Sequence, residues 1–156
     1  MLGGTFYRTG QTDLSVPGNG YANILHVTTG EDSCSSWATL TYGCRNPAIF
    51  FGPQEGLLVH SAVNGINNRG PLFPSSTLTV GVDTTIEIIQ EIDMDGKMMF
   101  RVVIDNTEEY KEENKDARDF ANVEVYASDP WKLHYRPDYT LGFIKDFSIY
   151  VKNDQN

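Results

Sequence analysis

The sequence has no run of about 18 apolar residues, the length that a membrane-spanning helix requires, so we expect no membrane insertion. It is also poor in cations. Lys and Arg together number 12, whereas Asp and Glu number 21, which gives a formal net charge of -9. Because binding to phosphates needs clustered cations, we expect neither a nucleic acid nor an anionic membrane surface as a partner. The charge balance instead suits a cationic partner or calcium.

Sequence motifs of the common catalytic and cofactor sites are missing as well. No Cys/His cluster has the spacing of a zinc site, and no glycine-rich phosphate loop follows an expected strand. His26 and His60 lie within apolar stretches, and neither is near a Ser-Gly nucleophile motif. No Asn-x-Ser/Thr sequence for N-glycosylation occurs. We therefore expect a protein that is not an enzyme.

Cysteine is scarce too, with Cys34 and Cys44 as the two thiols. They lie in a Ser/Thr/Gly-rich stretch, residues 29–47, and in an oxidising compartment they would close a small loop worth about 2–3 kcal/mol. The alternative is two unrelated thiols. The first eight residues lack the apolar segment of a signal peptide. The chain is thus expected to be either cytosolic or a piece of a secreted protein, and the cysteine pair favours an extracellular location.

Residues 84–105 have the clearest pattern in the chain and predict one long β-hairpin. Apolar residues occupy even positions on both sides of an Asp95-Gly96 turn signal: Ile86, Ile88, Ile92, Met94, Met98, Phe100, Val102 and Ile104. A loop of odd length is needed to keep both apolar sets on one face. We therefore predict a three-residue loop, 94–96, with Gly96 left-handed and Asp93 paired with Lys97. The even face is expected to be core, and the odd face charged and solvated.

Short strand patterns separated by turn signals fill most of the remaining chain. We predict strands at 21–28, 48–51, 57–63, 120–127 and 141–151, and a weak one at 77–80. Residues 1–20 are expected to form an edge strand or arm, 64–70 a polar turn, and 108–119 a charged, solvated connection. A chain of 156 residues with nine to eleven strands predicts a single all-β domain over residues 1–156, an antiparallel two-sheet sandwich.

The order of segments from residue 56 onward resembles a laminin G-like domain of the concanavalin A-like jelly-roll superfamily. The matching segments are Gly56–Gly65, Leu78–Ile88, Val102–Asn106, Val123–Ala127 and Leu141–Ile149. The resemblance implies a jelly-roll sandwich and a non-enzymatic extracellular module for binding or adhesion. It also implies calcium at one rim, held by loop carboxylates and backbone carbonyls. The calcium candidates are Glu31, Asp32, Asn64, Asn67 and Asp129, although such loop residues also serve to cap turns.

Three loops, 29–47, 64–70 and 128–140, carry aromatic, amide and guanidinium side chains. Such side chains recognise glycans or protein surfaces by stacking and planar hydrogen bonds. The alternative is that Trp131 and Tyr135 cover the end of the core. The candidate ligand-binding residues are Trp37, Tyr42, Arg45, Asn64, Asn67, Arg69, Asp129, Trp131, His134 and Tyr135.

Residues 91–95 offer a different hypothesis, because Glu91-Ile-Asp-Met-Asp95 is similar to the catalytic strand of retaining glucanases. Glu91 and Asp93 match that motif, with Asp95 at the position of the general acid. The predicted loop, however, removes Asp95 from the pleated ladder, so strand alternation running into a turn explains the same residues. A glycoside hydrolase using Glu91 and Asp93 is therefore one alternative function. A structural domain that forms homo-oligomers is another.

Overall fold

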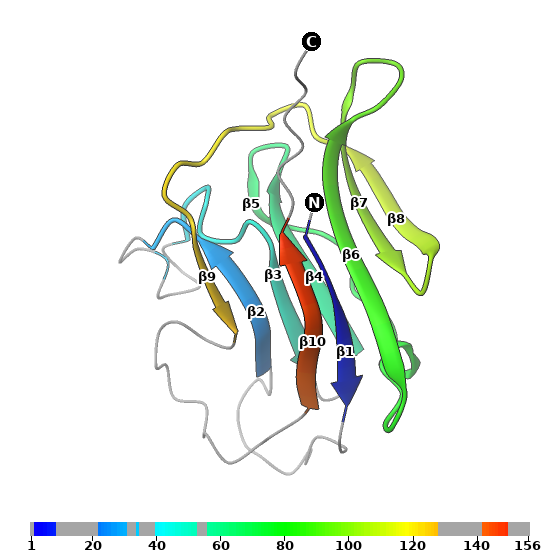
Figure 1. Cartoon of the computed structure of the whole chain (residues 1–156). Coiled ribbons are helices and arrows are strands. Elements are labelled where there is room, and N and C mark those ends of the chain that lie inside the picture. Colours follow the sequence, from blue (N-terminus) through cyan, green and yellow to red (C-terminus); the bar gives the residue numbers. More distant parts are fainter. Residues whose placement is uncertain are drawn as a thin grey trace. The chain divides into compact units, whose positions relative to one another are not determined.

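The computed structural model describes residues 2–8, 22–30, 34, 40–52, 56–127 and 142–149. Within these residues the chain forms ten strands, arranged in two five-stranded antiparallel sheets (Figure 1). The predicted fold class, an all-β chain with two antiparallel sheets, is thereby confirmed. None of the described residues forms a helix long and apolar enough to cross a membrane.

The first compact unit consists of residues 1–11, 78–115 and 140–156. Its sheet has the order β10 (Gly142–Ile149), β1 (Leu2–Arg8), β6 (Asp83–Ile92), β7 (Met98–Ile104) and β8 (Thr107–Glu113). One face of this sheet is apolar and buried, and it carries Phe6, Ile86, Ile88, Phe100, Val102 and Ile104. Three distant segments of the chain therefore build one sheet.

The β6–β7 hairpin has the predicted register. Ile92 lies opposite Met98, Ile88 opposite Val102 and Ile86 opposite Ile104. The Asp93 backbone N–H donates to the Lys97 carbonyl at 2.8 Å, and Gly96 has a φ of 76°, as the three-residue loop requires. The prediction of a wholly solvated odd face was wrong, because Ile89 and Met99 on that face are buried. Alternation tells which face a side chain is on, whereas its burial depends on what surrounds that face.

Residues 2–8 correct the expectation of an edge strand or arm, because β1 lies between β10 and β6 and pairs with both. Its sequence misleads because Gly3 and Gly4 supply no apolar alternation. Residues 107–113 correct a second expectation. They form β8, the strand at one edge of this sheet. Charged side chains on an edge strand oppose pairing with the sheet of another molecule.

The second compact unit consists of residues 12–77 and 116–139. Its sheet has the order β5 (Ile66–Arg69), β4 (Gly56–Val63), β3 (Ala48–Gly52), β2 (Ala22–Thr28) and β9 (Glu124–Ala127). Both faces of its central strands are buried, which explains their continuous apolar sequences. One face carries Leu25, Val27, Ile49, Phe51, Leu57 and Val59, and the other carries His26, Ala48, Phe50 and Leu58.

The segments that join these strands differ from the predictions in three places. Residues 66–69, predicted as a polar turn, form the short strand β5 after the Asn64-Gly65 turn. Residues 75–77 form a 3-10 helix, η2, so the weak strand predicted at 77–80 was wrong. Strand β9 is shorter than the predicted 120–127. Pairing with strands that are distant in the sequence decides where each strand begins and ends, and a local sequence pattern does not predict that pairing.

Candidate functional site

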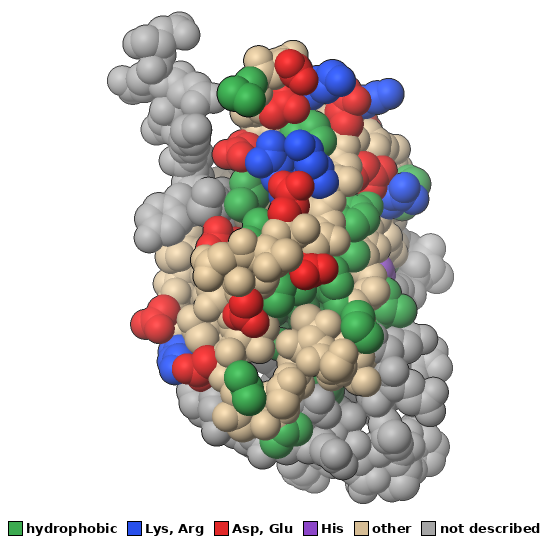
Figure 2. Space-filling model, turned by 90° about the vertical axis from the view of Figure 1, so that its right-hand side faces the viewer, with side chains coloured by type: hydrophobic (Ala, Val, Ile, Leu, Met, Phe, Trp, Pro, Cys, Tyr) green, Lys and Arg blue, Asp and Glu red, His purple; other side chains and the backbone are tan. Residues whose placement is uncertain are grey.

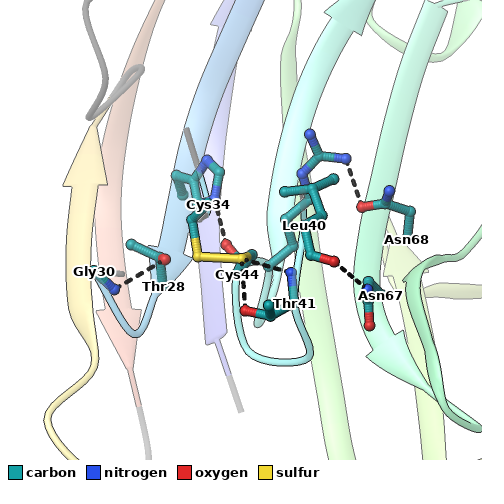
Figure 3. The surroundings of a disulfide bond; sticks show 10 residues. Thr28, Gly30, Cys34, Leu40, Thr41, Cys44, Asn67 and Asn68 are labelled. Carbon is teal, nitrogen blue, oxygen red and sulfur yellow. Dashed lines mark hydrogen bonds between the residues drawn. A yellow bond between two sulfur atoms is a disulfide. The ribbon is translucent and has the colours of Figure 1, made fainter. Parts of the chain in front are cut away.

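A disulfide anchors the loop that precedes β3 (Figure 3). Cys34 and Cys44 are bonded, as predicted, and both are buried. The Sγ atom of Cys44 accepts hydrogen bonds from the Thr41 backbone N–H at 3.2 Å and from the Thr41 hydroxyl at 3.3 Å. Figure 3 also shows Asn67 of β5 pointing at Leu40, to whose carbonyl its Nδ2 donates at 2.5 Å. The bridge and these bonds hold residues 40–44 in one conformation.

His26 of β2 joins the sheet to this loop. Its Nε2 lies 2.7 Å from the Cys44 carbonyl oxygen and its Nδ1 lies 2.7 Å from Asn23 Nδ2. These partners select the neutral tautomer in which Nε2–H donates to the carbonyl and Nδ1 accepts from the amide. Burial lowers the pKa of His26 to about 4, and the nearby Arg45 charge acts in the same direction. His26 is therefore a neutral structural group at neutral pH.

Arg45, one of the predicted ligand-binding residues, lies in the interior of the second unit. The residue is 4% exposed, and its Nη1 donates to Asn68 Oδ1 at 2.6 Å and approaches His60 Nδ1 at 3.4 Å. The guanidinium also lies 4.9 Å from the centroid of the Phe50 ring. Burial, followed by the Arg45 charge, lowers the pKa of His60 to about 4. Arg45 thus links β3, β4 and β5 from within.

Tyr42, by contrast, is at the centre of a partly exposed cluster. The Arg118 guanidinium lies 4.1 Å from the Tyr42 ring centroid, and the Phe120 ring stacks on Tyr42 at 5.9 Å between centroids with an interplanar angle of 27°. The Tyr42 hydroxyl donates to the Asp116 carbonyl at 2.7 Å. Arg118 in turn donates to both carboxylate oxygens of Asp116, at 3.2 Å and 2.7 Å. This bidentate pair raises the pKa of Arg118.

The Asn64-Gly65 turn between β4 and β5 lies next to this cluster. Both residues have left-handed backbones, with φ values of 54° and 74°, which is typical of two-residue hairpin turns. A Cβ atom built on Gly65 would lie 3.6 Å from Asp116 Oδ2, which places the turn beside the carboxylate. We name the set Tyr42, Asn64, Asp116, Arg118 and Phe120 the Tyr42 rim.

The structure brings together some of the predicted site residues. Tyr42 and Asn64 belong to the rim, Asn67 supports the loop behind it, and Arg69 is exposed at the end of β5. The predicted residues Glu31, Asp32, Trp37, Asp129, Trp131, His134 and Tyr135 lie outside the described residues. Sequence reasoning missed Asp116, Arg118 and Phe120. The charged pattern of a connecting segment does not indicate whether one of its arginines stacks on an aromatic ring that is distant in the sequence. A mixed charged and aromatic segment, 116–120, was the available signal.

The predicted metal and catalytic residues have these surroundings. Among the described residues, no group of three or more His, Cys, Asp or Glu side chains is arranged to hold a metal ion. Glu91 Oε1 lies 3.2 Å from Arg101 Nη1. Asp93 Oδ1 accepts the backbone N–H groups of Asp95 and Lys97, each at 2.9 Å, and these bonds lower the pKa of Asp93. Calcium binding and glycoside hydrolysis both stay predictions.

Comparisons of this chain with protein-family models, with curated proteins and with solved structures find no match. The resemblance to laminin G-like domains therefore stays a prediction carried by the sequence segments themselves.

Proposed function

We propose that this chain is a non-enzymatic extracellular binding module and that the Tyr42 rim is its recognition surface for a glycan. The observation that carries the proposal is the Arg118 guanidinium, held over the Tyr42 ring and paired with both oxygens of Asp116. The side chain of Arg118 is 52% exposed, so a ligand can reach it. A fixed, accessible guanidinium beside a carboxylate offers planar donors and acceptors to sugar hydroxyls.

The rim has the two properties that sugar recognition requires. Asp116 adds a carboxylate paired with the guanidinium, and the Asn64-Gly65 turn lies beside that carboxylate. The partly exposed Phe120 adds apolar ring surface for the C–H face of a sugar. The cluster is also ordered in advance. Stacking and the bidentate pair restrict Arg118 before binding, which reduces the side-chain entropy that a ligand would otherwise have to overcome.

The disulfide supports an extracellular location, because such bonds persist in oxidising compartments. The resemblance to laminin G-like domains supports a binding module and extends the proposal to calcium at one rim of the module. Asn64 is a described residue that could supply a carbonyl oxygen there, while Glu31, Asp32 and Asp129 are the predicted carboxylates. The proposal is that calcium assists binding.

A glycan array probed with and without calcium tests the proposal. The parent chain is expected to bind one class of glycan, and Arg118→Gln is expected to lose most of that signal, since it removes the charge and the paired donors. Lys97→Gln is the matched control, because Lys97 is an exposed cation in the turn of the β6–β7 hairpin and should leave binding unchanged.

Three results would count against these assignments. If Arg118→Gln binds every array glycan as well as the parent, the rim is not the recognition surface. A parent chain that binds no glycan, yet captures a purified protein through Arg118, would change the ligand class from glycan to protein. If EDTA changes neither the melting temperature nor the binding signal, calcium has no part in recognition.

A further inference from the structure

A polar hollow lies on the β1–β6–β10 part of the first sheet, on a different compact unit from the Tyr42 rim. It has a volume of about 300 Å³ and is lined by Gly3, Gly4, Thr5, Thr85, Glu87, Asp146 and Ser148. Its lining therefore combines three hydroxyl groups with two carboxylates. Register places the central part of it across three strands, because Gly3 pairs with both Glu87 and Ser148.

The hollow exists because Gly3 has no side chain. A Cβ atom at this position would lie 3.5 Å from Glu87 Cγ and 3.9 Å from Ser148 Oγ, which are ordinary van der Waals distances. Gly3 also has no left-handed backbone that would require glycine. Glycine in the interior of a middle strand weakens that strand by roughly 0.5–1 kcal/mol, and it commonly marks a place where another group approaches the backbone. The fold itself therefore does not require glycine at position 3, where the backbone forms the bottom of the hollow.

A β-bulge in β10 brings the second carboxylate to the hollow. The register with β1 shifts between Gly3, which pairs with Ser148, and Thr5, which pairs with Lys145. Residues 146 and 147 thus lie opposite the single residue Gly4, and Asp146 has a φ of 53°. Bulges of this kind change the direction of a side chain that regular alternation would point elsewhere. The carboxylate of Asp146 thereby lines the hollow together with Glu87.

These two carboxylates lie outside the ion pairs of the same sheet. Most Lys and Arg side chains in the view of Figure 2 lie next to Asp or Glu side chains. The ion pairs of this sheet join Arg101 to Glu91 and Glu108, and Lys145 to Asp83. Within the part of the chain that the structure describes, no ion pair involves Glu87 or Asp146. The hollow therefore carries two negative charges that no described cation neutralises.

We propose that the hollow binds the cationic end of a lysine or arginine side chain of a partner polypeptide. The ammonium or guanidinium group would donate to the two carboxylates and to the hydroxyls of Thr5, Thr85 and Ser148, all of which accept hydrogen bonds. The volume of the hollow suits a single side chain. The net charge of -9 increases the local concentration of such a cationic partner.

Nuclear magnetic resonance titration with short peptides tests this proposal. The probes are N-acetylated, C-amidated Gly-Lys-Gly and Gly-Arg-Gly, with Gly-Gln-Gly as the neutral control. The two cationic peptides are expected to shift the backbone amides of Gly3, Glu87 and Ser148, and the shifts should shrink in high salt because exposed charges are screened. Gly-Gln-Gly is expected to leave these amides unchanged.

Two variants separate the charges of the hollow from its shape. Glu87→Gln with Asp146→Asn should weaken peptide binding by about fivefold to tenfold, since two exposed charge pairs are lost, and Asn tolerates the left-handed backbone at position 146. Gly3→Val keeps both charges but fills the hollow, so it should also weaken binding while leaving the fold intact. Asp95→Asn with Glu109→Gln removes the same number of charges from exposed positions outside the hollow.

The control double variant should bind the cationic peptides like the parent. Equal loss in the control and in the Glu87/Asp146 variant would overturn the proposal, because net charge alone would then explain binding. Unchanged binding by Gly3→Val would overturn it as well, since the hollow would not be the site. Shifts of the same amides with Gly-Gln-Gly, with a neutral disaccharide or with calcium alone would assign the hollow to a different ligand.

Discussion

The Arg118 guanidinium carbon lies 4.1 Å from the centroid of the Tyr42 ring, although the two residues belong to segments that are far apart in the sequence. Tyr42 stands in the disulfide-anchored loop before β3, and Arg118 follows β8. The stack converts a flexible surface cation into a fixed group with a known partner on each side, Tyr42 and Asp116.

The Tyr42 hydroxyl should contribute measurably to stability. Tyr42→Phe keeps the ring stack but removes the bond to the Asp116 carbonyl, so we expect the free energy of unfolding to fall by about 1 kcal/mol. Urea denaturation followed by fluorescence measures the change. Tyr126→Phe is the matched control, because the Tyr126 hydroxyl donates to the exposed Glu124 carboxylate and its loss should cost little. Equal losses for the two variants would mean that the Asp116 contact is not a stabilising one.

Gly43 should tolerate no side chain. Its φ is 109°, and a Cβ atom would lie 2.8 Å from Phe120 Cε1 and 3.0 Å from Thr29 Cγ2. Gly43→Ala must therefore strain the backbone and displace Phe120 from Tyr42, at a cost of roughly 1–3 kcal/mol. The melting temperature should fall accordingly. Gly96→Ala is the comparison, since Gly96 has a positive φ but nothing within 4 Å of its Cβ position, and it should be the milder change.

Two buried histidines should make the protein less stable in mild acid. The pKa values of His26 and His60 are lowered from 6.5 to about 4 in the folded chain. Above pH 6.5 both are neutral whether the chain is folded or unfolded, so stability is at its full value. Between pH 6.5 and pH 4 the unfolded chain binds protons that the folded chain excludes, and the free energy of unfolding falls. The loss is on the order of 3 kcal/mol for each histidine.

Urea denaturation at a series of pH values between 7 and 4 measures this effect. His60→Gln removes one of the two titrating groups and keeps an acceptor for Arg45, so its stability should depend less on pH than that of the parent. A parent chain with the same free energy of unfolding at pH 7 and pH 4.5 would contradict the prediction. So would a His60→Gln variant with an unaltered slope.

The disulfide should stabilise the chain mainly by restricting its unfolded state. Replacing Cys34 and Cys44 by Ala opens a loop with a sequence separation of 10, which costs about 2–3 kcal/mol in the chain-entropy treatment. Thermal unfolding of the double variant, compared with the parent before and after reduction by dithiothreitol, measures this. Reduced parent and double variant should melt at similar temperatures. If the reduced parent melts at the same temperature as the oxidised parent, the bridge does not stabilise the folded chain.

Glu91 should prove dispensable for glycan binding. Its carboxylate pairs with Arg101 at a partly exposed position, so Glu91→Gln should change the free energy of unfolding by less than about 1 kcal/mol. We expect the parent to release no reducing ends from β-glucans and other polysaccharides, and the variant to bind array glycans like the parent. Release of reducing ends by the parent that disappears in Glu91→Gln would establish the hydrolase alternative.

Much of the fold follows from local pattern, and much of the site does not. The alternation on both sides of Asp95-Gly96 predicted a register that the structure confirms residue by residue. The same reasoning failed for β1, where Gly3 and Gly4 carry no apolar signal, and for β8, where an edge strand has a mostly charged sequence. Pairing with neighbours on the sheet decides such strands, and those neighbours are distant in the sequence.

The sequence by itself determined the all-β class, the turn of the β6–β7 hairpin and the two cysteines that form the bridge, because side-chain period, turn chemistry and thiol count are local properties. Only the tertiary structure decided that Arg45 is buried against Phe50 while Arg118 is exposed over Tyr42. Their different roles arise from which ring and which carboxylate the folded chain brings within a few ångströms of each guanidinium, and strand pairing at long range sets that arrangement.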